Sequence, residues 1–490
     1  MLYRTRIAFS LLLLLLIGLP GKTWAGATDS LFQQHCASCH GQHRLGGMGP
    51  ALLPDNLSRL RKPQAMDVIS EGRAATQMPG FKAVLSADQI QALADYIYQP
   101  PAHTPRWTLQ DIQGSHVIHY DIKQLPDTPA FKADLQNLFV VVELGDHHAT
   151  LLDGDSFTPI HRFQTRFALH GGPKYSPDGR FVYFASRDGW ISKFDIYNLK
   201  TVAEIRAGIN TRNMAVSFDG RYAMVANYLP HNLVLLDTEN LTPIKVIPVE
   251  GRVSAVYTAP PRNSFVAALK DSKTILEIPY REPFPTLIIP TETYLDDFFF
   301  DQEYNHLIGA SREGDRGQVI DLNNSRTVAT IPLAGMPHLG SGISWQYQGK
   351  TVMATPHLKE GKVSIIDMSN WQVIKQIDTL GPGFFMRSHD NSPYAWVDVF
   401  FGPNKDVVHL IDKRTLEIAH TLQPEPGKTA AHVEFTKDGS HALLSIWEQD
   451  GAVIVYDANT LKEVKRLPMR KPSGKYNVYN KTHYAAGTSH

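Results

Sequence analysis

The sequence predicts a small α-helical domain followed by an all-β propeller of eight blades. Two observations carry this prediction. Near the front of the chain, a Cys-x-x-Cys-His motif at residues 36–40 precedes an amphipathic helical segment at 86–98. Behind it, an apolar strand that ends in an acidic residue recurs every 40 to 46 residues, a period typical of propeller blades.

The composition excludes several classes of protein. The chain has 490 residues, 43% of them hydrophobic, with 48 basic and 48 acidic side chains and two cysteines. This length exceeds one ordinary hydrophobic core, so we expect more than one domain. Because the charges balance, there is no basic stripe to indicate a nucleic-acid partner. Two cysteines are too few for a disulfide scaffold or a four-cysteine metal or iron–sulfur site.

Residues 1–25 have the pattern of a cleaved signal peptide. Arg4 and Arg6 precede the apolar run 11–16, and Ala25 ends the segment before the expected cut. An N-terminal membrane anchor is the alternative, but the apolar run is short for a bilayer, and no later segment is long and apolar enough to span one. We therefore expect an exported protein without a membrane span, located in a bacterial periplasm.

Residues 36–40 indicate covalent attachment of one haem c. The thiols of Cys36 and Cys39 are spaced to add to the two vinyl groups of a haem, and His40 follows at once to ligate the iron. A redox-active cysteine pair or a structural disulfide is the alternative interpretation of the two cysteines.

The segment 28–99 resembles class I cytochrome c. Gly-Pro-Ala-Leu at 49–52 stands where that family has a turn at the haem edge, and Ser86 precedes the expected terminal helix as a good N-cap. The resemblance implies Met78 as the sixth iron ligand, and a thioether opposite imidazole closes the iron to small ligands. The alternative ligands are Met48, Met66, His35 and His43.

We expect this cytochrome c domain at residues 26–100 and a linker at 101–110, stiffened by the prolines around residue 100. The propeller then covers residues 111–490. Its repeat is marked by one acidic residue a blade: Asp153, Asp195, Asp237, Glu277, Asp321, Asp367, Asp412 and Asp457. Turns such as Pro-Asp-Gly at 177–179 separate alternating apolar runs. A solenoid or tandem sandwiches are the alternative architectures.

Equivalent positions in a propeller point at the same place, so the residue just before each innermost strand should face the central axis. These positions hold His170, Arg212, Arg252, Asp296, His338, Arg387, His432 and Tyr476. All eight are polar or ionisable. Arginine holds carboxylates in a bidentate manner, and neutral imidazole ligates iron. The ring therefore predicts a site for a flat anion that carries carboxylates and a metal, with Arg187 and Tyr228 at its rim.

The propeller resembles the haem d1 domain of the cytochrome cd1 nitrite reductase family, and with the front domain the likeness covers nearly the whole chain after residue 25. The matching stretches are 168–170, 176–179, 186–189, 202–205, 337–340, 354–357, 434–439 and 472–480. The resemblance implies that His170 is the proximal ligand of the d1 iron. It also implies that Arg187, Arg212, Tyr228 and Arg252 lie near the macrocycle and its carboxylates.

Three departures separate this chain from the nitrite reductases of the family. His338 matches one of their two distal histidines, but Asp296 stands at the other, and Ser341 replaces an arginine. His432 stands where the reductases have no histidine. These departures point to the paralogous branch of dihydro-haem d1 dehydrogenases. The resemblance implies an oxidoreductase of denitrification that turns a propionate of dihydro-haem d1 into an acrylate, the last step of haem d1 biosynthesis.

In this interpretation His170 and His338 hold the d1 iron, and the arginines, including Arg387, hold carboxylates. We expect His432 to accept the proton, with Tyr476 as the alternative base, because histidine titrates near neutrality and tyrosine near pH 10. The two electrons leave through haem c to an external acceptor, and nitrite reductase is a candidate recipient of the haem d1 formed. The alternative functions are a nitrite reductase with altered proton donors and a non-catalytic d1 haem carrier.

Overall fold

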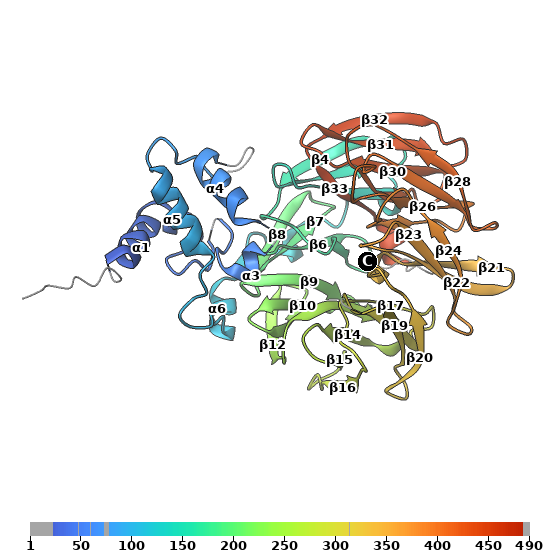
Figure 1. The fold of residues 1–490 in the computed structure, drawn as a ribbon, viewed down its shortest axis with the longest axis horizontal. Helices are drawn as coiled ribbons and strands as arrows, with labels where there is room; N and C mark the ends of the chain where they lie inside the picture. Colours follow the sequence, from blue (N-terminus) through green and yellow to red (C-terminus); the bar gives the residue numbers. More distant parts are fainter. Residues whose placement is uncertain (1–22, 48, 59, 73–77, 313, 484–490) are drawn as a thin grey trace, which may run out of the picture.

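The computed structural model describes residues 23–47, 49–58, 60–72, 78–312 and 314–483. Within this part of the chain, a group of short helices stands beside a larger ring of β-sheets (Figure 1). The predicted architecture of a helical cytochrome c domain followed by an eight-bladed propeller is therefore confirmed. The signal-peptide features at residues 1–22 and the alternative haem ligand Met48 lie outside the described residues.

The front domain packs its helices around a small apolar core. These helices are α1 (Thr23–His35), α2 (Ala37–His40), α3 (Pro54–Leu57), α4 (Lys62–Glu71) and α5 (Ala87–Ile97). The predicted cap of α5 is present, because Gln89 N donates to Ser86 Oγ at 3.2 Å and Ser86 N donates to Gln89 Oε1 at 2.8 Å. The apolar face of α5 is buried against α1 and α4.

Each blade is an antiparallel sheet of four consecutive strands, apart from the blade that joins the two ends of the chain. After α6 (Leu109–Gly114), the short strand β1 (Val117–Ile118) adds to the outer edge of the blade that holds β5 to β8. Two 3-10 turns, Ile122–Gln124 and Leu135–Asn137, follow. The blade strands are β2 (Leu138–Glu143), β3 (His148–Asp153), β4 (Thr158–Gln164); β5 (Lys174–Tyr175), β6 (Phe181–Ala185), β7 (Trp190–Asp195), β8 (Lys200–Arg206); β9 (Asn210–Val216), β10 (Tyr222–Leu229), β11 (Asn232–Asp237), β12 (Thr242–Pro248); β13 (Val253–Ala259), β14 (Ser264–Leu269), β15 (Thr274–Pro279), β16 (Leu287–Pro290); β17 (Asp297–Phe300), β18 (His306–Ala310), β19 (Arg316–Asp321), β20 (Arg326–Pro332); β21 (Ile343–Tyr347), β22 (Lys350–Pro356), β23 (Lys362–Asp367), β24 (Gln372–Asp378); β25 (Met386–Arg387), β26 (Tyr394–Asp398), β27 (Val408–Asp412), β28 (Glu417–Leu422); β29 (Ala430–Phe435), β30 (His441–Ile446), β31 (Gly451–Asp457), β32 (Glu463–Met469); and β33 (Pro472–Asn477).

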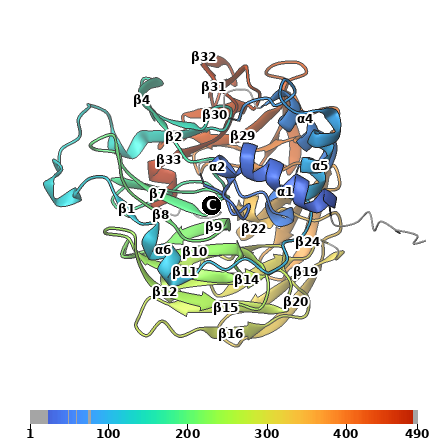
Figure 2. The ribbon, with the colours of Figure 1, turned by 90° about the vertical axis from the view of Figure 1, so that its left-hand side faces the viewer.

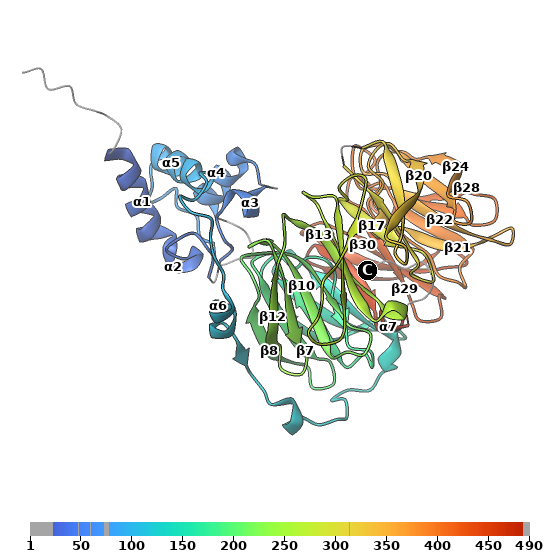
Figure 3. The same ribbon diagram turned by 90° about the horizontal axis from the view of Figure 1, so that it is seen from below.

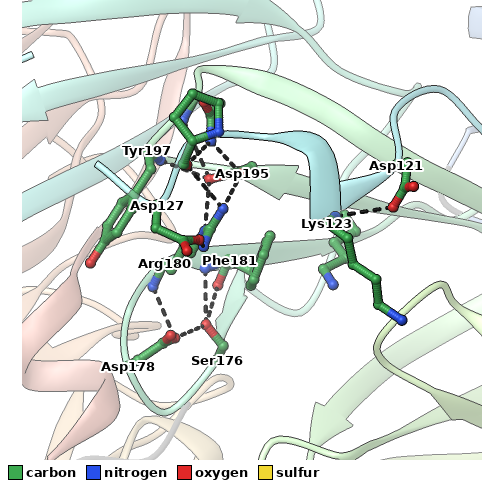
Figure 4. Close-up of polar contacts among 12 residues, drawn as sticks. Asp121, Lys123, Asp127, Ser176, Asp178, Arg180, Phe181, Asp195 and Tyr197 are labelled. Atoms are coloured by element: carbon green, nitrogen blue, oxygen red, sulfur yellow. Dashed lines mark hydrogen bonds and ion pairs between the residues drawn. The ribbon is translucent and has the colours of Figure 1, made fainter. Parts of the chain in front are cut away.

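The acidic residue that marks the sequence repeat shapes the turn after the third strand of a blade. Asp195 Oδ1 accepts a hydrogen bond from Tyr197 N at 2.9 Å, and Asp195 Oδ2 also pairs with Arg180 Nη2 at 3.1 Å (Figure 4). In the same view, Asp178 Oδ1 accepts from Arg180 N at 3.1 Å and closes the predicted Pro-Asp-Gly turn. Glu277 differs, because it lies inside β15 rather than at its end. The repeat can therefore be recognised in the sequence, because these carboxylates accept hydrogen bonds from residues of their own turns.

The two ends of the propeller chain meet in one blade. β33, near the C-terminus, pairs antiparallel with β2, so that Tyr476 lies opposite Val140. Strands at the start of neighbouring blades, such as β9 and β13 or β29 and β33, contact one another and surround the axis. The helix α7 (Val478–Thr482) follows β33 directly. Closure therefore brings Tyr476 and α7 against β2 and β5, near the start of the propeller chain.

The helical domain docks on one face of the propeller, beside β8 to β10 (Figures 2 and 3). Its loop residues Ala51 and Leu53 form a shared apolar cluster with Ile209 and Leu229 of the propeller. The buried Arg206, at the end of β8, donates through Nη2 to Leu45 O in the loop that follows the Cys-x-x-Cys-His motif. The loop that follows the Cys-x-x-Cys-His motif therefore lies on the side of the helical domain that contacts the propeller.

The buried side chain of His357, directly after β22, predicts acid sensitivity of the fold. His357 Nδ1 lies 2.6 Å from Ala334 O and Nε2 lies 2.9 Å from Ser364 Oγ, and burial lowers the pKa of this imidazole from 6.5 to about 4. Since the unfolded chain binds the proton more readily, acidification favours unfolding. We expect the free energy of unfolding to fall by about 3 kcal/mol between pH 6.5 and pH 4. In His357→Gln, the free energy of unfolding measured by urea titration should depend less on pH over this range. The same dependence on pH in the variant and the parent protein would contradict the role of His357.

Candidate functional site

A cavity of about 340 Å³ lies where the first strands of the blades converge. This volume lies in the range of small-molecule and cofactor sites. Six of the eight predicted ring residues line it: His170, Arg212, His338, Arg387, His432 and Tyr476. Arg187 lines it as well, whereas Arg252 and Asp296 are not among the lining residues. The sequence period therefore brings most of the predicted site residues together.

His170 and Arg212 face each other across neighbouring blades. His170 Nδ1 lies 2.6 Å from Arg212 O, which is the geometry of an N–H that donates to a carbonyl. The lone pair then belongs to Nε2, which lies 3.2 Å from Arg212 Nη1. Arg212 is itself fixed, because its Nε donates to Ser254 O at 2.7 Å. His170 thus has the tautomer of a metal ligand, with its second nitrogen oriented by a carbonyl.

His338 has the same arrangement on another blade. Its Nδ1 lies 2.5 Å from Phe384 O, and its ring packs against the Phe384 ring at 4.3 Å between centroids. The Nε2 atom is 3.8 Å from Asp297 Oδ2. Both cavity histidines that the sequence assigns to the d1 iron therefore carry their proton on Nδ1 and offer Nε2.

His432 differs from these two histidines in its backbone and in its hydrogen bonds. It is the extra residue of a β-bulge in β29, where Ala431 pairs with Ser445 and Val433 with Leu444, and its φ is +54°. Among the described residues, its buried Nδ1 atom has no hydrogen-bond partner. Bulges re-aim side chains, and this one brings the His432 ring to the cavity wall while its Nδ1 atom stays buried.

Burial lowers the pKa of His432 well below its ordinary value, and the positive charges of Lys475, Lys481 and Arg387 lower it further. The imidazole is therefore neutral near pH 7 and offers a lone pair. Its ring lies 5.2 Å from the Tyr476 ring between centroids. Burial raises the pKa of Tyr476 well above its ordinary value, and the nearby Glu434 raises it further, so this phenol remains protonated.

Sequence reasoning missed Lys481, a half-buried lysine in the cavity wall. Lys481 lies in α7, and its Nζ is 5.7 Å from the centre of the Tyr476 ring. Arg387 pairs with the buried carboxylate of Glu434, with Nη2 and Nε both 3.0 Å from Oε1. Only the tertiary structure brings Lys481 to the cavity, because it follows the last strand and belongs to no repeat.

Tyr228 and Arg252 lie beside the cavity in a positively charged group. Burial alone would raise the pKa of the Tyr228 phenol, but the charges of Arg212, Lys270, Arg187 and Arg252 outweigh it and lower this pKa. Arg252 forms a salt bridge with Asp271, with 2.6 Å between Nη2 and Oδ1. The structure thus surrounds this wall of the cavity with cations that attract an anionic ligand.

The residues at the front of the chain fit a haem c. The thiols of Cys36 and Cys39 are both free. His40 Nδ1 lies 2.8 Å from Pro50 O, which leaves the lone pair on Nε2, and burial lowers the pKa of the ring so that it stays neutral. Gly49 packs directly against this ring, where a Cβ atom would come within 2.8 Å of His40 Cε1. Met78 begins the described segment that leads into α5.

Comparison with known proteins places the chain in a family. The family model for the cytochrome D1 haem domain matches residues 133–481, and the model described as cytochrome C oxidase, cbb3-type, subunit III matches residues 25–97. The chain belongs to the cytochrome d1 haem domain family. Dihydro-heme d1 dehydrogenase of Pseudomonas aeruginosa is 57% identical over 97% of this chain and 98% of that protein.

Two further relatives bear on the site. The solved structure of dihydro-heme d1 dehydrogenase NirN in complex with DHE superposes with a TM-score of 0.91 and 58% identity, over 93% of this chain and 99% of that one. Nitrite reductase of Stutzerimonas stutzeri is 25% identical over 93% of this chain and 92% of its own length. This d1 family member is therefore much more similar to the dehydrogenase than to the reductase.

Over the described stretches 23–47, 49–58, 60–72, 78–312 and 314–483, no helix combines the length and the apolar character that crossing a membrane would require.

Proposed function

We propose that this protein is a dehydrogenase of dihydro-haem d1 that converts a propionate side chain into an acrylate and completes haem d1. The reaction breaks two C–H bonds, forms a C=C bond and releases two protons and two electrons. The observation that carries the proposal is the contrast among the cavity histidines. His170 and His338 each direct Nδ1 at a backbone carbonyl, as metal-ligating histidines do, whereas Nδ1 of the bulged His432 is buried and has no hydrogen-bond partner among the described residues.

His432 is the base of this proposal. A neutral imidazole in the cavity wall can accept a proton from a saturated carbon of the substrate side chain. Tyr476 stands next to it with its proton retained, so it serves as a hydrogen-bond donor to the substrate carboxylate and orients the side chain. The two residues that the sequence left as rival bases therefore take different roles.

The cations around the cavity orient the substrate. Arg187, Arg212 and Lys481 line the cavity and hold carboxylates of the macrocycle, while Tyr228 and Arg252 stand behind them. Arg387 also adds positive charge to the cavity wall, although its Nε and Nη2 atoms already bind the Glu434 carboxylate. Since the substrate brings several carboxylates, it balances the positive charge that these side chains bring to the cavity.

His170 and His338 hold the iron of the substrate from its two sides. With both axial positions occupied, small ligands such as nitrite have no place on the metal. A haem c held by Cys36, Cys39, His40 and Met78 supplies one-electron redox chemistry when bound. Because the oxidation releases two electrons, the protein also needs an external electron acceptor.

The remaining proposals concern where the protein works. The pattern of residues 1–25 supports export to the periplasm, with removal of a signal peptide. The product, haem d1, is the group that the related nitrite reductases would receive, so such a reductase is the proposed recipient and denitrification the proposed setting.

Absorption spectroscopy of the haem c-loaded protein tests this function. We expect the spectrum of bound dihydro-haem d1 to change into that of haem d1 when an external acceptor is supplied, with no nitrite turnover. Sustained nitrite reduction with retained haem d1 would favour the reductase. Release of unchanged dihydro-haem d1 would favour a carrier. Either outcome would overturn the proposal.

A further inference from the structure

The bulge at His432 puts the backbone of a buried residue in an unfavourable conformation. A non-glycine residue with φ of +54° is strained, and a bulged residue loses the ladder hydrogen bonds of its strand. Since His432 is buried, its backbone N–H and C=O need partners from elsewhere. These two partners fix the conformation that aims the imidazole.

Two buried ionisable residues, Asp398 and Lys475, bind the backbone N–H and C=O of His432. Asp398, the last residue of β26, accepts a hydrogen bond from His432 N through Oδ2 at 3.3 Å. Lys475, in β33, donates through Nζ to His432 O and to Ser445 Oγ, the latter at 2.7 Å. Asp398 and Lys475 belong to the blades on either side of the one that carries His432. The bulge is therefore held by hydrogen bonds from both neighbouring blades.

Asp398 also reaches the second cavity histidine. Its Oδ1 accepts hydrogen bonds from Phe384 N at 2.7 Å and from Phe385 N at 3.0 Å. The carbonyl of Phe384 is the group that accepts from His338 Nδ1. One carboxylate thus links the segment that orients His338 to the bulge that orients His432.

We propose that Asp398 is a positioning residue that sets the placement of His432 relative to His338, and so of the base relative to the substrate iron. This inference rests on the proposed function. Asp398 itself does not need to touch the substrate, because it acts through backbone groups that flank the cavity. Burial raises its pKa to about 7, while three N–H donors and the charge of Lys475 oppose this rise. A carboxylate fits all three N–H groups, since it only accepts hydrogen bonds.

This donor pattern makes Asp398→Asn a selective test. The amide oxygen can still accept from Phe384 N and Phe385 N, but the amide NH₂ then faces His432 N, so that two donors oppose each other. The placement of His338 should survive while the bulge at His432 shifts. Asp398→Ala removes both links and should disturb both histidines.

Asp406→Asn is the matched control. Asp406 is also buried and follows β26 by a few residues, and its Oδ2 accepts from Gly427 N at 2.7 Å and from Gln423 Nε2 at 2.9 Å. It is not among the residues that line the cavity. A general loss of a buried carboxylate should therefore affect both variants, whereas a loss of positioning should affect only Asp398→Asn.

We expect Asp398→Asn to lower kcat about 10- to 100-fold, because a displacement near 1 Å at a reacting group costs this much. Its Kd for dihydro-haem d1 and the electron paramagnetic resonance spectrum of the bound substrate iron should remain those of the parent protein. Asp398→Ala should change that spectrum, and Asp406→Asn should change neither quantity. A parental kcat in Asp398→Asn would overturn the inference.

A crystal structure of the substrate-free Asp398→Asn protein separates this inference from the proposed function. We expect a changed φ at His432 with His338 in place, and an unmoved His432 would overturn the positioning role even if the parent protein oxidised dihydro-haem d1. If Asp398→Asn does not fold, Lys475→Gln tests the same bulge from its carbonyl side and should show the same loss of kcat with retained Kd. Parental kcat in that variant would count against the inference equally.

Discussion

The His432→Ala variant should bind dihydro-haem d1 and leave it unoxidised. Removing the imidazole eliminates the neutral base that we propose in the cavity wall, and general base catalysis of this kind contributes about 10²- to 10⁴-fold to a rate. His170 and His338, which we propose as ligands of the substrate iron, are untouched. We therefore expect a normal Kd and a rate of acrylate formation lower by about 10²- to 10⁴-fold, measured by single-turnover absorption spectroscopy.

Two comparisons sharpen this experiment. His338→Ala should alter the spectrum of the bound substrate iron, whereas His432→Ala should not, because His338 directs Nδ1 at a carbonyl as metal ligands do and His432 does not. In the parent protein, the acidic limb of the pH–rate profile should lie below pH 6.5, since burial and neighbouring cations lower the pKa of His432. Conversion at the parental rate in His432→Ala would show that another group accepts the proton.

The Cys36→Ser/Cys39→Ser variant should retain the substrate but lose turnover with an external acceptor. This variant lacks both thiols to which we propose that haem c is attached, and so it should lack the covalent redox group of the front domain. The cavity should stay intact, because the core of the front domain is separate from the clusters that hold the blades together. Loss of the c-type absorption bands and retained binding of dihydro-haem d1 are the expected measurements.

Ser38→Ala is the matched control for this variant. Ser38 lies between the two cysteines, its side chain is exposed, and a hydroxyl makes no bond to a haem. It should retain the c-type bands and parental turnover. Undiminished turnover in the double cysteine variant would show that the electrons leave without haem c.

Much of the architecture is predictable because it arises from short-range chemistry. The Asp195 turn and the Ser86 cap use residues within a few positions of one another, so their patterns stand in the sequence unchanged. The period of the blades then brings His170, Arg212, His338 and His432 to one cavity. A repeat fixes the direction of equivalent positions even when the residues are more than 40 apart.

The details of the site could not be predicted in this way. Arg252 and Asp296 occupy ring positions but do not line the cavity, and Arg387 is paired with Glu434 from the next blade. Asp398 and Lys475 stand at strand positions that look like ordinary core, and nothing in the sequence ties them to His432. Their roles depend on which strands become neighbours across blade boundaries.

The sequence by itself therefore determined the two-domain plan, the eight blades, the attachment motif at residues 36–40 and most of the residues that face the axis. Only the tertiary structure decided which histidines direct Nδ1 at a carbonyl, which one has a buried Nδ1 without a partner among the described residues, and which buried ionisable groups support them. The physical reason is that turns, caps and periods are set by near neighbours along the chain. Tautomers, bulges and buried ion pairs are set by contacts between strands that come together only when the ring closes.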